Sequence, residues 1–196
     1  MNAIRNVFSL IGLLAVVATV YVASVYRDDI AAVRALDPGA AQMYAEMWSR
    51  IKETGTSADA TAWRIPLAEG VAPADAEQVM KFVANQHNIS GVGELPLSEQ
   101  VELMTGEKQR FLKIYEYCDP RTAMQMVDYS DAFSAYLPCR IALVEDKDGH
   151  YALYSLNMDL MISGGRPLPP DLKKEALRVK QIIRDIMERG ATGELF

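Results

Sequence analysis

The N-terminus of the chain carries an unbroken apolar segment, VFSLIGLLAVVATVYVASVY, from Val7 to Tyr26, with no charged residue and no proline. An α-helix of about 20 residues rises 1.5 Å per residue and therefore covers the roughly 30 Å hydrocarbon core of a bilayer. Tyr21 and Tyr26 lie toward one end of the segment, where aromatic rings favour the interface between lipid and water. The segment predicts one transmembrane helix whose partner is the lipid bilayer, so the rest of the chain must fold outside the membrane.

Two other roles for this segment stay open. Val22, Ala23 and Ser24 offer a small-residue cleavage site, as in a signal peptide, but the apolar run is longer than the roughly 7–15 residues of a signal-peptide core. A buried helix of a soluble domain is the third role, and a run without charged residues at the N-terminus disfavours it. The uncleaved anchor is the interpretation that the sequence favours.

The charges that flank the segment bear on its orientation. Arg5 and the α-amine precede it, while Arg27 and Arg34 follow it, so the positive-inside rule comes close to a tie. A short N-terminal tail kept inside, with the following domain exported, is the common arrangement for such anchors. We therefore expect a single-pass protein of the inner membrane whose soluble domain lies in the periplasm.

The composition describes a folded and acidic domain. The chain is 50% hydrophobic and 23% charged, which is ordinary for a globular protein. Its formal net charge is −6, and because Arg5 and Arg27 cancel Asp28 and Asp29, this charge belongs to the residues after the anchor. Binding to nucleic acid or to an anionic lipid surface needs clustered Lys and Arg. The charge argues against both, and we expect no nucleic-acid partner.

Composition divides the chain into four parts. These are the anchor (1–29), an amphipathic helix and linker (30–61), an α+β domain (62–165) and a C-terminal helix that packs on it (166–196). In the second part, the helical spacing of the apolar residues predicts a helix from Ala40 to Glu53. This helix could pack on the domain, stand as a stalk or pair with another subunit. Residues 54–61, TGTSADAT, are small and polar and predict a linker.

Strands and helices alternate in the predicted domain. Strands are expected at 63–67, 89–95, 111–117, 140–145 and 151–156, and helices at 73–86, 98–104, 119–128 and 171–189. Pro66 restricts the first strand to a sheet edge, Ser98 and Asp119 are expected N-caps, and Gly190 is expected to end the last helix. Asp148 and Gly149 supply the turn of a hairpin. The order predicts a small antiparallel or mixed sheet covered by helices and preceded by one transmembrane helix.

Several motifs of this domain resemble a known family. The sequence YEYCDP (115–120) is followed by LPCR (137–140), by the strand IALVED (141–146) and by Asp148-Gly149. This succession of strand, polar-Pro helix start, Leu-Pro step and acidic-Gly hairpin turn is similar to the domain of unknown function 302 family, here in a membrane-anchored member. The resemblance covers roughly residues 73–162, with the C-terminal helix outside it. It implies a small α+β domain, often a dimer, with no established reaction and no catalytic residue to carry over.

Cys118 and Cys139 are the candidate site residues. Cys118 ends a predicted strand and precedes the N-cap Asp119. A helix N-terminus stabilises a thiolate, although the carboxylate of Asp119 opposes that effect. Cys139 follows Pro138 at the start of the next strand. Because both lie near strand ends, we expect that they can be neighbours in space.

Three interpretations of these cysteines stay open. They can be unpaired, with at least one buried as a small hydrophobic residue. They can form a disulfide that closes a loop of about 20 residues, worth roughly 3 kcal/mol. They can also form a redox or soft-metal site, for which nearby thioethers would suit Cu(I) or haem, at Met124, Met126, Met158 and Met161. Met124, however, shares a helical face with Val127, so core packing would explain it.

No residue pattern in the chain converges on a reaction. Gly91-Val92-Gly93 lacks the later glycine and the lysine of phosphate-binding loops. We therefore predict no catalytic residue, no metal site and no cofactor, and interpret the chain as a non-enzymatic, membrane-tethered accessory or interaction module. It would self-associate or dock on another membrane protein. The alternative is a redox or soft-ligand protein that binds sulfur species, Cu or haem through Cys118 and Cys139.

Overall fold

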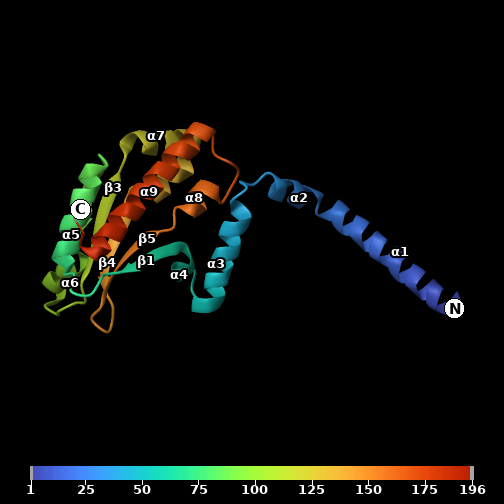
Figure 1. Cartoon of the computed structure of the whole chain (residues 1–196), viewed down its shortest axis with the longest axis horizontal. Coiled ribbons are helices and arrows are strands. Elements are labelled where there is room, and N and C mark those ends of the chain that lie inside the picture. Colours follow the sequence, from blue (N-terminus) through green and yellow to red (C-terminus); the bar gives the residue numbers. More distant parts are fainter. Residues whose placement is uncertain (1, 195–196) are drawn as a thin grey trace.

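The computed structural model describes residues 2–194, which form an α+β domain with a helical arm at its N-terminus (Figure 1). The arm and its junction with the domain comprise α1 (Asn2–Val25), α2 (Arg27–Arg34), α3 (Ala40–Thr54) and α4 (Ser57–Thr61). The domain helices are α5 (Pro73–Gln86), α6 (Leu97–Thr105), α7 (Pro120–Tyr129), the 3-10 turn η1 (Asp131–Tyr136), α8 (Asp159–Ser163) and α9 (Pro170–Thr192). The strands are β1 (Ala62–Pro66), β2 (Ser90–Leu95), β3 (Leu112–Cys118), β4 (Cys139–Glu145) and β5 (Tyr151–Leu156).

The five strands form one antiparallel sheet in the order β1-β5-β4-β3-β2. The hairpin of β4 and β5 lies at its centre, and Gly149 has the positive φ of 86° that the turn requires. β1, which contains Pro66, is an edge strand as predicted. The predicted α+β fold is confirmed, and every strand pairing is antiparallel.

One face of the sheet holds the core. Side chains alternate along each strand, so Tyr115, Ile141 and Leu153 point to the same side and are buried there. α5 and α9 pack on this face with α7 beside α9 (Figure 1). The stripe of α9 that its spacing predicts is confirmed as buried, with Leu172, Ala176, Val179, Ile183 and Ile186.

The opposite face of the sheet, which we call the open face, also carries apolar side chains. Leu95, Ile114, Ala142 and Tyr154 form one row across four strands, and none of them belongs to the core cluster. Arg64 lies beside Tyr154, with its Nε donating a 2.9 Å hydrogen bond to the phenol oxygen. The sheet is therefore apolar on both sides although the core occupies one.

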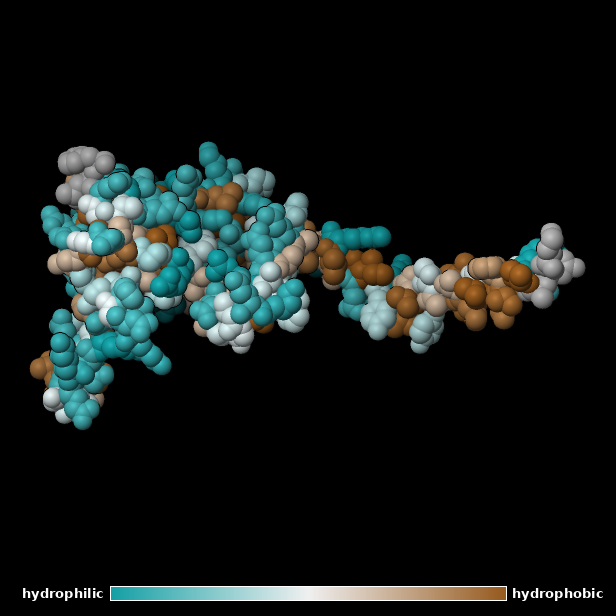
Figure 2. All heavy atoms as spheres, turned by 60° about the horizontal axis from the view of Figure 1, so that its bottom comes forward, coloured by the Kyte–Doolittle hydropathy of each residue, from teal (hydrophilic) through white to brown (hydrophobic). Residues whose placement is uncertain are grey.

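The arm leaves the domain as an extended helix (Figure 1). From Ile4 to Val25 it has a mean hydropathy of 2.3, and none of this apolar surface is buried against the domain. Figure 2 shows the corresponding hydrophobic band, which contrasts with the mostly hydrophilic domain. By length and composition α1 can cross a membrane, a property that it shares with signal sequences.

The junction between the arm and the domain is fixed by Asp37, which is only 3% exposed. Its backbone N–H donates to Gly165 O at 2.8 Å, and its carboxylate pairs with Lys173 of α9. The Tyr44 hydroxyl of α3 donates to Gly164 O at 2.6 Å. Of the three arrangements open for this helix, the structure has α3 packed on the domain.

Five local details differ from the sequence expectations, and the last of them, at Gly190, is described separately below. The segment expected as a linker holds α4, because the Thr56 hydroxyl accepts from Ala58 N at 3.0 Å and caps it. Ser98 lies inside α6 and does not cap it, since its hydroxyl is hydrogen-bonded to Leu112 of β3. The short elements η1 and α8 have too few residues to show a periodic pattern and were missed.

Gly190 does not end α9, which continues to Thr192 before Gly193 adopts a left-handed φ of 73°. A Cβ atom on Gly190 would lie 2.6 Å from Met80 Cγ, and Met80 is fully buried in α5. Glycine is therefore required at this position because the backbone of α9 lies against a core side chain.

Gly190→Ala should lower the free energy of unfolding by about 1–2 kcal/mol, because overpacking costs more than the gain in helix propensity. Urea unfolding of the full chain in detergent measures this through tryptophan fluorescence, since both tryptophans lie outside α1. Gly91→Ala is the control, because a Cβ there meets nothing within 4 Å. Equal stability of the Gly190→Ala variant and the wild type would contradict the packing argument.

Candidate functional site

The two candidate cysteines meet at one end of the sheet. Cys118 is the last residue of β3 and Cys139 is the first of β4, where it pairs with Tyr117. Both are free thiols in the structure, and both line one small cavity of about 20 Å³, which we call the sulfur cavity. The N-cap prediction for the neighbouring helix is confirmed, since the Asp119 carboxylate accepts from Arg121 N at 3.1 Å.

Three methionines share this cavity with the cysteines. Met126 comes from α7, while Met158 and Met161 come from the N-cap and the body of α8. Met124 does not take part, because it is 59% exposed. The expectation that core packing explains Met124 is wrong, since α7 turns Met126 to the core in its place.

Both thiols are held in their protonated form. Burial raises the pKa of Cys118, and the charge of Asp119 raises it further. Burial raises the pKa of Cys139 to about 11, the neighbouring Cys118 adds to this effect, and Arg140 opposes it. The dipole of α7 was expected to favour a thiolate, but burial and Asp119 outweigh it. The pair therefore lacks the low pKa of nucleophilic cysteines, although a soft ligand can still displace the protons.

Iodoacetamide should modify both thiols slowly at neutral pH, and Cys139 more slowly than Cys118. A shift from the ordinary 9.0 to about 11 lowers the thiolate fraction of Cys139 by roughly 100-fold at a given pH. Peptide mass spectrometry of the full chain, with and without prior reduction, measures the rates, and Cys139→Ser assigns the remaining signal. Cysteines that react with iodoacetamide only after reduction would reveal a disulfide and contradict the free thiols of the structure.

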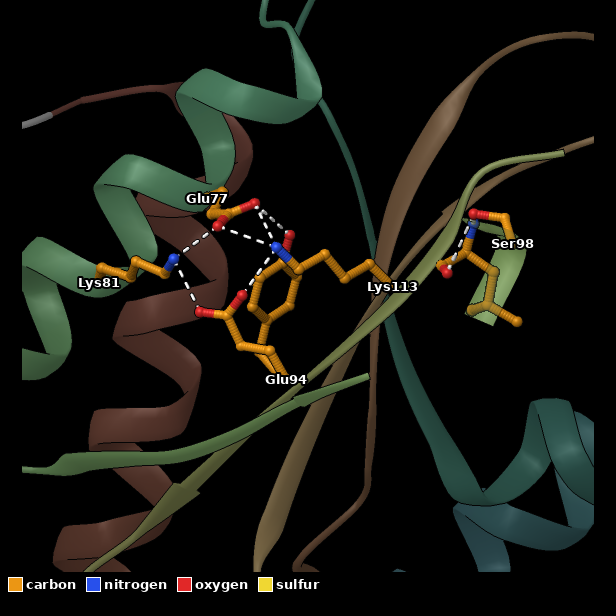
Figure 3. Close-up of polar contacts among 7 residues, drawn as sticks. Glu77, Lys81, Glu94, Ser98 and Lys113 are labelled. Atoms are coloured by element: carbon orange, nitrogen blue, oxygen red, sulfur yellow. Dashed lines mark hydrogen bonds and ion pairs between the residues drawn. The ribbon is translucent and has the colours of Figure 1, made fainter. Parts of the chain in front are cut away.

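A second group of polar side chains joins α5 to the sheet, and sequence reasoning missed it. Glu77 and Lys81 of α5 meet Glu94 of β2 and Lys113 of β3 (Figure 3). Glu94 lies 2.7 Å from both ammonium groups, and Lys113 lies 3.0 Å from Glu77. The Tyr115 hydroxyl donates to Glu77 at 2.8 Å. The Glu77–Lys81 spacing is visible in the sequence, but the other partners follow from strand register.

We call Glu77, Lys81, Glu94 and Lys113 the ion-pair cluster, and its two negative charges balance its two positive charges. Burial alone would raise the pKa of Glu77, but hydrogen bonds from Lys81, Lys113 and Tyr115 outweigh it and lower the pKa to about 2. Burial, and then the bond to Glu77, raises the pKa of Tyr115. Two carboxylates and two ammonium groups thus stay ionised around neutral pH, which suits a structural tie between α5 and the sheet.

Glu77→Gln should lower the free energy of unfolding by about 1–3 kcal/mol at pH 7, because a half-buried charge-assisted network is broken. The pKa of Glu77 is lowered from 4.5 to about 2, so its stabilisation is fully present above pH 4.5 and is lost as the pH falls through 2. The difference from wild type should therefore shrink below pH 4.5.

Urea unfolding at several pH values checks this, with the exposed Glu69→Gln as control. A difference between Glu77→Gln and wild type that stays constant from pH 7 to pH 2 would refute the assignment.

A cleft of about 430 Å³ opens beside this cluster, between α5 and β2–β3. Lys81, Asn85 and Glu94 line it, together with Tyr117. Tyr117 is 3% exposed, and its hydroxyl has no hydrogen-bond partner within residues 2–194. Tyr117 also lines the sulfur cavity, so this one side chain separates the polar cleft from the apolar cavity.

One exposed group offers metal-ligand atoms in the β4–β5 turn. Asp146, Asp148 and His150 each place one such atom within 4.8 Å of the others. Turn geometry explains this cluster, because Asp146 Oδ1 accepts from the backbone N–H of Asp148 and of His150, both at 2.9 Å.

Comparisons with known proteins place these features in a family. A sequence model for the family "Domain of unknown function DUF302" matches residues 66–190. No curated protein matches the chain. A similar solved structure is that of an uncharacterized conserved protein DUF302 from Bacillus stearothermophilus, with a TM-score of 0.54 and 12% identity over 66% of this chain and 97% of that one. At this identity the likeness shows the fold alone.

The matched range is wider than residues 73–162, on which the sequence resemblance depended. It takes in α9 as far as Gly190, so the expectation that the C-terminal helix lies outside the family is wrong. The physical reason is that α9 supplies much of the core beneath the sheet. Cys118, Cys139 and the ion-pair cluster all lie inside the match.

Proposed function

This chain belongs to the DUF302 family, and from that premise we propose that it is a non-enzymatic, membrane-tethered interaction module. Its α1 anchors it in the inner membrane, its domain lies on the periplasmic side, and its partner is a second copy of the chain. The observation that carries the proposal is an apolar helix that the domain leaves wholly exposed. An exposed helix of this length and hydropathy is stable in lipid and costly in water.

The fixed junction supports tethering over cleavage. Asp37 and Tyr44 attach the segment that follows the anchor to the domain, so α1 and the domain are joined without a long linker. Only α2 and the short turn after it separate α1 from the packed α3, so an uncleaved α1 would hold the domain close to the membrane.

The open face supports self-association. Its centre is apolar, with Ile114 and Ala142, while Glu116 and Arg140 are paired residues at one side of it. In a two-fold dimer the same patch meets itself, so the arginine of one copy can face the glutamate of the other. Anchoring in one membrane also raises the effective concentration of the copies.

Fractionation and a topology reporter test the tether. The full chain should stay with membranes in alkaline carbonate, and a variant without residues 2–25 should become soluble. Alkaline phosphatase fused to the C-terminus should be active in intact cells, while a fused green fluorescent protein should stay dark. A mature chain that begins after Ser24 would refute the anchor, and the opposite reporter pattern would refute the orientation.

Light scattering of the full chain in detergent tests the partner. Wild type should have the mass of a dimer, and Ile114→Lys should weaken self-association by at least about 100-fold, since a buried, unpaired charge costs several kcal/mol. Leu103→Lys, on the outer side of α6 at 87% exposure, is the matched control. A monomeric wild type would refute self-association.

A second candidate function is favoured by the sulfur cavity. The alternative of a redox or soft-ligand protein was based on Cys118 and Cys139, and five sulfur side chains line the cavity that they share. The raised pKa values of both thiols disfavour nucleophilic redox chemistry. Soft-ligand binding is therefore the form of this candidate that the geometry supports.

A further inference from the structure

The sulfur cavity concentrates soft ligand atoms that come from separate parts of the fold. Its thiols lie at the ends of β3 and β4, and its thioethers come from α7 and α8. The remaining lining is mostly apolar and includes Leu137, Ala176 and Val179. Two thiols and three thioethers from four separate elements therefore converge on one void, which is a donor set that suits a soft metal ion.

We propose that the sulfur cavity is a Cu(I) site, in which the thiolates of Cys118 and Cys139 bind the ion and the thioethers of Met126, Met158 and Met161 complete its soft surroundings. This site deepens the second candidate function and rests on it. Thiolate and thioether sulfur are the ligands that select Cu(I) among biological metals.

The size of the cavity restricts the ligand to a single ion. Its volume of about 20 Å³ is far below the roughly 300–1,000 Å³ of a site for an organic ligand, so haem does not fit. Zn²⁺ takes four Cys, His or carboxylate ligands, whereas this cavity offers two thiols. Asp119 also lines the cavity, but its carboxylate pairs with Arg178 and caps α7.

Binding is an exchange of protons for the ion, without electron transfer. One Cu⁺ replaces the two thiol protons, which leave to solvent, and two Cu–S bonds form in a complex with a net charge of −1. Arg140 follows Cys139 in β4, and its positive charge opposes the rise in that thiol's pKa. The same charge favours the anionic complex. Arg178 pairs with the carboxylate of Asp119 and offsets part of its negative charge.

The test uses the full chain in detergent, reduced, freed of reductant and shown to carry two alkylatable thiols. Under anaerobic conditions it competes for Cu⁺ with the chelator bathocuproine disulfonate. We expect one Cu⁺ per chain, with an affinity that rises by up to about 100-fold per pH unit near neutrality because two protons leave. X-ray absorption should show only sulfur around the ion.

Matched variants assign the ligands. Cys118→Ser combined with Cys139→Ser should weaken binding on the order of 1000-fold, and Met126→Leu, which conserves volume, by about 10-fold. Met124→Leu is the control on the same helix, because Met124 is exposed and does not line the cavity. Circular dichroism should show that every variant is folded.

Two results would overturn the site. One is a wild-type affinity for Cu⁺ equal to that of the double serine variant, and the other is an X-ray absorption shell of nitrogen or oxygen. A parallel titration with Zn²⁺ distinguishes failure of the Cu(I) site from failure of soft-ligand binding in general. Thiol-dependent binding of Zn²⁺ without Cu⁺ would refute Cu(I) and keep soft-ligand binding, whereas binding of neither metal would count against both. The tether and the dimer are tested separately and survive either result.

Discussion

A Cβ atom on Gly190 would lie 2.6 Å from Met80 Cγ of α5 and 3.4 Å from Leu153 Cδ1 of the sheet, so only glycine lets the backbone of α9 pack this closely. This close approach joins the two longest helices of the domain and the central strands in one core. The positions of the other features depend on it, because α5 carries the ion-pair cluster and α9 forms one wall of the sulfur cavity. A larger distance between α5 and α9 would disturb both the ion-pair cluster and the sulfur cavity.

The two candidate sites are neighbours with opposite chemistry. Tyr117 lines the sulfur cavity and the polar cleft, and the charges of Glu94 and Glu77 reach its buried hydroxyl, whose pKa they raise after burial itself. On the polar side, ammonium and carboxylate groups neutralise one another. On the apolar side, the thiols stay protonated. Burial is the main reason that both thiols stay protonated, because the charge of Asp119 adds to the rise in the pKa of Cys118 and that of Arg140 opposes the rise for Cys139.

Local sequence signals predicted the elements, whereas contacts between elements could not be predicted. The Asp119-Pro120 helix start, the Asp148-Gly149 turn and the stripe of α9 depend on residues close in the chain. The partners of Glu77 in β3 depend on strand register and on how α5 lies over the sheet. Gly190 was predicted to end the helix because glycine commonly does so. In the structure the same residue type instead allows close packing against Met80. The nearness of the cysteines was foreseen as a possibility, since each strand end could be located. Met126, Met158 and Met161 were also among the nearby thioethers named from the sequence, but which thioethers line the cavity depends on how α7 and α8 pack.

α8 connects the sulfur cavity with the arm. Its N-terminal part supplies Met158 and Met161 to the cavity, and the residues after it, Gly164 and Gly165, accept hydrogen bonds from Tyr44 and Asp37. A Cβ on Gly164 would lie 3.2 Å from Met43 Cε, so α3 leaves this end of α8 little room. Interiors packed in this way transmit small displacements. α8 and the two glycines after it thus connect the methionines of the sulfur cavity with the segment that carries α1.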